Sequence, residues 1–120
     1  MVTPKFRIPR GATPTLELQL PIDVSTGTWV VYVTFVQNHS VVLEYALNGT
    51  PSASSASPGS VSVDSQDGNT LLVDMTQADT LLLSPGDVEL QVRIKSPAGL
   101  ADTFLPEHGV VINNLKGGAI

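Results

Sequence analysis

The feature that most constrains the fold is a set of short segments in which apolar and polar residues alternate strictly. Residues 87–95 read DVELQVRIK, so every second side chain is aliphatic and most of those between are charged. Residues 15–20 read TLELQL and repeat the pattern. Because successive side chains of a strand point to opposite faces, a period of two predicts strands that bury one face and expose the other.

A second kind of segment is apolar on both faces. Residues 28–37 read TWVVYVTFVQ, nearly all β-branched or aromatic, which predicts a central strand covered on both sides. The short connection 38–40 leads into another apolar run at 41–47, so the two runs are expected to form a hairpin. Val61 and Val63 are expected to pair with Leu71 and Val73 across a turn at 66–69 that contains Asp-Gly.

Turn signals recur about every ten residues, which is the rhythm of a β-sandwich. The predicted fold class is therefore all-β, an antiparallel immunoglobulin-like sandwich of about seven or eight strands. One short helical turn is expected near 77–83, where Thr76 and Asp79 resemble a capping box and Ala78, Leu81 and Leu82 are expected to face the core. The core is expected to draw on Leu16, Leu18, Leu20, Trp29, Val31, Val33, Phe35, Leu71, Val73, Val88, Leu90, Val92 and Ile94.

The two ends differ from this regular middle. Residues 1–14 contain three prolines and are predicted to form an extended arm that lies on a partner or along the domain edge, with a frayed terminus as the alternative. The sandwich is expected over 15–113, with a flexible Ser/Ala-rich loop at 48–60 and a glycine-loosened tail at 114–120. The predicted partner-binding residues on the arm and tail are Phe6, Arg7, Ile8, Arg10, Leu115 and Ile120.

Composition excludes several functions. Charged residues make up only 14% of the chain, against about 25% in typical domains, which fits either a polar uncharged β domain or a surface covered by neighbours. The net charge of -5 and the scattered basic residues argue against nucleic acid and membrane partners. The absence of cysteine excludes disulfides and thiolate metal sites. No secretory signal or membrane-spanning run is visible, so synthesis in the cytoplasm is expected.

Candidate chemistry is sparse. His39 falls in a predicted hairpin turn and His108 in a predicted loop, and the sequence contains no Gly-x-Ser-x-Gly turn. Residues 64–69 resemble part of a calcium loop but lack its terminal glutamate, and a hairpin turn accounts for them. The acidic residues of the strands, Glu44 among them, are expected on solvated faces. No catalytic, cofactor-binding or metal-binding residue is therefore predicted, and the protein is not expected to be an enzyme.

Three stretches carry a resemblance to a known family. They are residues 10–15 (RGATPT), 29–37 (WVVYVTFVQ) and 75–92 (MTQADTLLLSPGDVELQV). Together they resemble small virion-associated proteins of tailed phages and prophages of Gram-positive bacteria. They are also similar to the immunoglobulin-like N-terminal domain of phage upper baseplate proteins. The similarity covers most of the chain outside residues 50–60.

The resemblance implies a non-enzymatic structural part of a phage particle, either a capsid-decoration or head-associated protein or a tail or baseplate protein. Its expected partners are other virion proteins and copies of itself, and its expected location is the virion after synthesis in the host cytoplasm. The alternative is a β-sandwich module that binds a glycan or protein on the host surface.

Overall fold

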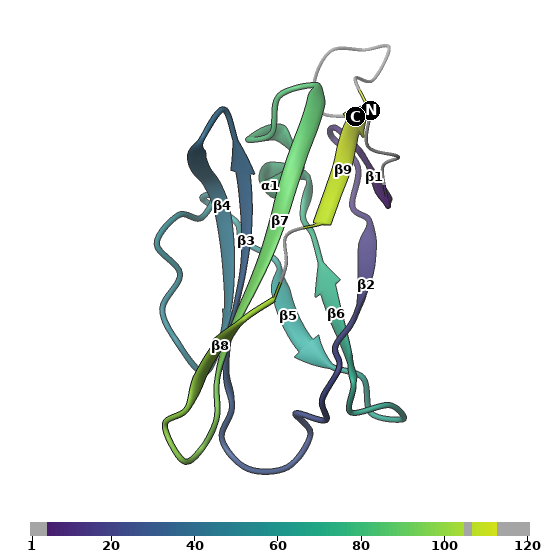
Figure 1. Cartoon of the computed structure of the whole chain (residues 1–120). Coiled ribbons are helices and arrows are strands. Elements are labelled where there is room, and N and C mark those ends of the chain that lie inside the picture. Colours follow the sequence, from purple (N-terminus) through teal and green to yellow (C-terminus); the bar gives the residue numbers. More distant parts are fainter. Residues whose placement is uncertain (1–4, 105–106, 113–120) are drawn as a thin grey trace.

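The computed structural model is a sandwich of two β-sheets, which confirms the all-β class (Figure 1). It describes residues 5–104 and 107–112. The larger sheet has the order β1-β9-β7-β3-β4 with β8 also paired to β7, and the smaller sheet has the order β2-β6-β5. The elements are β1 (Phe6–Pro9), β2 (Thr15–Gln19), β3 (Val30–Gln37), β4 (Ser40–Leu47), β5 (Ser60–Val63), β6 (Thr70–Asp74), α1 (Gln77–Leu81), β7 (Gly86–Lys95), β8 (Ala101–Thr103) and β9 (Glu107–Ile112).

The expected central strand is β3, which pairs antiparallel with β4 on one side and β7 on the other. The β3–β4 hairpin closes at the Gln37–Ser40 pair. Its two turn residues, Asn38 and His39, have φ of 52° and 63°, as the commonest two-residue hairpin turn requires. The predicted register between β5 and β6 is also confirmed, since Val61 lies opposite Val73.

The core lies between the two sheets and matches the alternating pattern closely. Of the thirteen expected core residues, twelve are buried, and Trp29 is half-buried against them. The alternation identifies these residues because every second side chain of β2 and β7 faces the opposite sheet. The structure adds apolar residues that carry no clean alternation, namely Ile8, Val24, Leu43, Tyr45, Val61, Met75, Leu83 and Val111.

The first strand differs from the sequence expectation of an arm. Residues 6–9 pair in parallel with β9, with Ile8 opposite Val111, and form an edge of the larger sheet. Ile8 is 0% exposed, so its aliphatic side chain gains burial within the domain itself. Of the two placements considered for this segment, the structure has the one along the domain edge. The parallel pair also makes the larger sheet mixed, where an antiparallel sandwich was expected.

Phe6 covers a glycine on the neighbouring strand. Phe6 lies opposite Gly109 in the β1–β9 ladder, and a Cβ at that position would overlap the Phe6 ring. Gly109→Val is therefore expected to displace the ring and loosen β1, with a loss of about 1–3 kcal/mol from overpacking. Amide hydrogen exchange of residues 6–9 would report the loosening. Val110→Ala is the matched control on the outer side of the same strand, and equal exchange in both variants would contradict the prediction.

The short helix is capped as expected but turned differently. The Thr76 hydroxyl accepts from the Asp79 amide and the Asp79 carboxylate accepts from the Thr76 amide, which completes a capping box. The expected inward face of Ala78, Leu81 and Leu82 is wrong, since Leu82 is 43% exposed and the buried helix residues are Asp79 and Thr80. Hydrogen bonds explain this orientation: both polar side chains tie neighbouring loops to the helix.

Candidate binding groove

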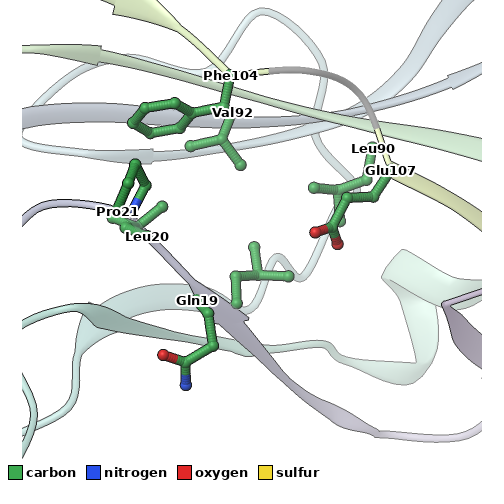
Figure 2. Close-up of a pocket in the computed structure, with 8 residues that line it drawn as sticks. Gln19, Leu20, Pro21, Leu90, Val92, Phe104 and Glu107 are labelled. Carbon is green, nitrogen blue, oxygen red and sulfur yellow. The ribbon is translucent and has the colours of Figure 1, made fainter.

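An apolar groove opens on one lateral side of the sandwich, between β2 of the smaller sheet and β7 of the larger one (Figure 2). Its volume is about 300 Å³. That is at the lower end of the range for ligand pockets, so it suits one or two side chains better than a large cofactor. The groove is lined by Leu18, Gln19, Leu20, Pro21, Leu90, Val92, Phe104 and Glu107.

One wall of the groove is a strand edge. Among the described residues, β2 is the outermost strand of the smaller sheet and pairs with β6 alone. The Leu20 amide donates to the Asn69 carbonyl, and the Met75 amide donates to the Pro14 carbonyl. The even-numbered residues of this segment therefore bond to β6 and to the residues that flank it. Hydrogen bonding alternates along an antiparallel pair, so the backbone N–H and C=O groups of Glu17 and Gln19 point away from β6. Both residues are exposed, and no described residue bonds to these backbone groups.

One of the described residues that line the groove is ionisable. Glu107 lies opposite Leu90 in the β7–β9 ladder, and Figure 2 shows its carboxylate on the cavity side beside Leu90. The other lining residues are neutral, and Glu17 adds a second carboxylate on the exposed strand edge. Glu107 therefore places a negative charge beside the apolar floor of the groove.

The opposite lateral side of the sandwich is closed by the loop between β4 and β5. The Glu44 amide donates to the Ala53 carbonyl at 2.7 Å, and the Ser52 amide donates to the Glu44 carboxylate at 2.8 Å. Thr34 and Arg93 also donate to this carboxylate, at 2.8 and 3.2 Å. Glu44 is only 4% exposed, so the expectation of a solvated side chain is wrong. The loop folds over it and supplies one of its donors, the Ser52 amide.

A second buried carboxylate holds the other end of the same loop. Asp79 is 0% exposed. Its carboxylate accepts from the Tyr45 and Ser55 hydroxyls at 2.6 Å each and from the Gly59 amide at 2.8 Å. The Ser/Ala-rich loop expected to be flexible is thus fixed at both ends. The two sides of the sandwich differ as a result, with the β4 edge covered and the β2 edge open.

Both carboxylates have a lowered pKa. Burial alone would raise the pKa of Asp79, but hydrogen bonds from Ser55, Tyr45, Gly59 and Thr76 together hold it below the usual value. For Glu44, burial also opposes ionisation, and the Ser52, Thr34 and Arg93 donors again lower the pKa. Each group is therefore a carboxylate at neutral pH and serves as an anchor for the loop.

These shifts predict an acid dependence of stability. A group whose pKa is lower in the folded protein stabilises the fold above its unfolded pKa, about 4, and loses that contribution as the pH falls through the folded pKa. The melting temperature is therefore expected to fall as the pH is lowered below about 5. Thermal melts of wild type and Asp79→Asn test this, because the variant is expected to show the weaker dependence. Identical pH profiles for the two proteins would contradict it.

The two histidines lie in a polar depression on the outer face of the larger sheet. His108 belongs to strand β9, not to the predicted loop, and lies opposite Glu89 of β7. His39 enters from the β3–β4 turn, and both line a depression of about 390 Å³ with Asp87. The described residues that line it include no serine, threonine or cysteine. Only the register of strands distant in sequence brings these residues together, so the sequence carries no signal for it.

The described residues contain neither a metal-binding cluster nor a membrane-spanning helix. Within residues 5–104 and 107–112, no three His, Cys, Asp or Glu side chains converge in a way that could hold a metal ion. In the calcium-like segment, Asp64 and Asp67 accept hydrogen bonds from backbone amides two residues on, as turn chemistry predicts. No helix among the described residues has the length and hydropathy to cross a bilayer.

The predicted partner-binding residues separate into three groups. Arg7 is exposed on β1 and remains accessible to a partner. Ile8 is fully buried, Phe6 packs against the core, and Arg10 donates to the Leu83 and Leu81 carbonyls, so these three stabilise the domain itself. The remaining two lie outside the described residues: Leu115 and Ile120.

Comparisons with known proteins bear on the fold. No protein-family model matches the chain, and a search of the curated proteins gives no match. Among solved structures, the chain is similar to CopC from Methylosinus trichosporium OB3b, with a TM-score of 0.51 and 13% identity over 93% of this chain and 87% of that one. The likeness supports the β-sandwich fold. At this identity it carries no information about what the groove binds.

Proposed function

We propose that this protein is a non-enzymatic structural subunit of a tailed-phage particle, in the head or in the tail and baseplate, and that it acts by binding other proteins. The observation that carries the protein-binding part is the lateral groove, where an apolar cavity adjoins an unpaired strand edge. Strand edges of this kind are the places where β proteins add another chain. The phage context rests on the sequence resemblance.

The chemistry of the groove favours a polypeptide over a substrate. Its floor is aliphatic and aromatic, and the described residues of its lining include no nucleophile and a single carboxylate. Catalysis by acid and base normally requires two groups in register with a reacting atom. The low charge of the whole chain, 14% of residues, also suits a surface that neighbours cover in an assembly.

Particle association tests the proposal. Phage particles are purified on a density gradient from an induced host strain that carries the gene, and an antibody to the protein is used to probe each fraction. We expect the protein to co-sediment with particles at a fixed ratio to the major capsid protein. Recovery of all of it in the soluble fraction, with particles that lack it, would overturn the proposal.

A glycan array separates this function from the alternative of a host-glycan module. Sugar binding normally uses exposed aromatic rings. Among the described residues, the Tyr32 ring is covered by the Arg93 guanidinium at 5.1 Å, and the Trp29 indole donates to the Thr26 carbonyl. We expect no specific glycan signal from the purified protein. A reproducible hit would favour the host-surface function.

A further inference from the structure

We propose that the groove binds an extended segment of a partner polypeptide, which adds to the free edge of β2 as a further strand. An aliphatic side chain of that segment fills the cavity, and a lysine or arginine two residues away pairs with Glu107. This inference rests on the proposed function and names the chemistry of its partner.

The backbone of β2 supplies the first part of the recognition. The backbone N–H and C=O groups of Glu17 and Gln19 face away from β6, and no described residue forms a hydrogen bond with them. An added strand satisfies them in the way that strand addition does elsewhere. Pro14 and Pro21 flank β2, so the edge is short and an added segment can bond over only a few residues.

The face of the added strand that points at the larger sheet supplies the second part of the recognition. An added strand in the smaller sheet points alternate side chains at the larger sheet, as β2 does with Leu18 and Leu20. Those side chains meet the apolar floor formed by Val92 and Phe104, whose backbones are joined by a 3.0 Å hydrogen bond. Burial of one aliphatic side chain there removes apolar surface from water and favours binding.

The spacing of the floor residues supplies the third part. Leu90 and Val92 are two residues apart on β7, about 7 Å along the strand, and Glu107 lies opposite Leu90. Side chains at i and i+2 of an extended partner have the same separation. A partner residue over Val92 therefore places the residue two positions away over Glu107, where the carboxylate favours a cation.

Two synthetic nine-residue peptides test the proposal. The first, TSVTLTKTS, carries valine, leucine and lysine on one face, and in the second a glutamate replaces the lysine. Binding of fluorescein-labelled peptides to the purified protein is measured by anisotropy. The lysine peptide is expected to bind about tenfold or more tightly than the glutamate peptide, because Glu107 repels the second. Absence of binding by the lysine peptide at millimolar protein overturns the proposal.

Matched variants separate the backbone contact at β2 from the charge contact at Glu107. Glu17→Pro removes an outward amide while the ladder to β6 stays intact, and Glu17→Ala removes the same side chain but keeps that amide. The proline variant is expected to bind the lysine peptide about tenfold less tightly than the alanine variant. Glu107→Gln is expected to bring the affinities for the two peptides close together. Circular dichroism melts establish that each variant is folded, and equal binding by the proline and alanine variants overturns strand addition.

The same variants keep this inference distinct from the proposed function. If wild-type protein co-sediments with particles and Glu17→Pro does so equally well, the groove is not the docking site, although the protein is still a particle component. If wild-type protein does not associate with particles, the proposed function itself fails, whatever the peptides show.

Discussion

Replacing Asp79 with alanine is expected to lower the free energy of unfolding by about 3–5 kcal/mol, because several donors lose their acceptor and each buried donor left unsatisfied costs about 1–3 kcal/mol. Asp79 is fully buried and accepts from Tyr45, Ser55, Gly59 and Thr76. Urea unfolding followed by tryptophan fluorescence measures the loss.

The effect is also expected to be local to one loop. Without the carboxylate, the Ser55 hydroxyl and the Gly59 amide lose the bonds that hold the end of the loop before β5. Elastase cleaves after small residues, so its cleavage within 52–57 is expected to be faster in the variant. Tyr45→Phe is the matched control, because it removes one donor and leaves the carboxylate, with an expected loss of about 1 kcal/mol. Equal stability of Asp79→Ala and Tyr45→Phe would contradict a network centred on Asp79.

This network shows where prediction from sequence ends. Thr76 and Asp79 are three residues apart, so a capping box can be recognised from their spacing. The partners Tyr45 and Ser55 are 34 and 24 residues away, and nothing in the local pattern indicates that they approach the same carboxylate. For the same reason, the orientation of α1 with Asp79 inward contradicts a rule that apolar residues face the core.

The core can be predicted from the local sequence, whereas the groove depends on strand order. The period of two in β2 and β7 identifies Leu18, Leu90 and Val92 as inward-facing, since that pattern depends only on neighbours in the chain. That these residues also line an open groove depends on β2 being an edge strand opposite β7, which is a property of strand order. The placement of β1 depends on strand order in the same way. Its prolines indicate an edge strand, but its parallel partner β9 lies about a hundred residues later in the chain.

The second large effect is expected at Phe35. This residue is 0% exposed on the central strand β3, and its ring meets Tyr45 edge to face at a centroid distance of 6.0 Å and an interplanar angle of 77°. Phe35→Ala removes the ring contact and leaves a cavity between the sheets, so the free energy of unfolding is expected to fall by about 3–5 kcal/mol. Equilibrium unfolding in urea is the measurement.

Two control variants test whether the loss of stability in Phe35→Ala comes from lost buried volume. Phe35→Leu retains most of the apolar volume and is expected to cost about 1.5 kcal/mol or less. Leu100→Ala shortens an apolar side chain that is 77% exposed. It is expected to change the free energy of unfolding by less than about 0.5 kcal/mol. Because Tyr45 joins Phe35 to Asp79, the double variant Phe35→Ala with Asp79→Ala is expected to lose less than the sum of the single losses. A Phe35→Ala loss no larger than that of Leu100→Ala would mean that β3 does not run through the centre of the sandwich.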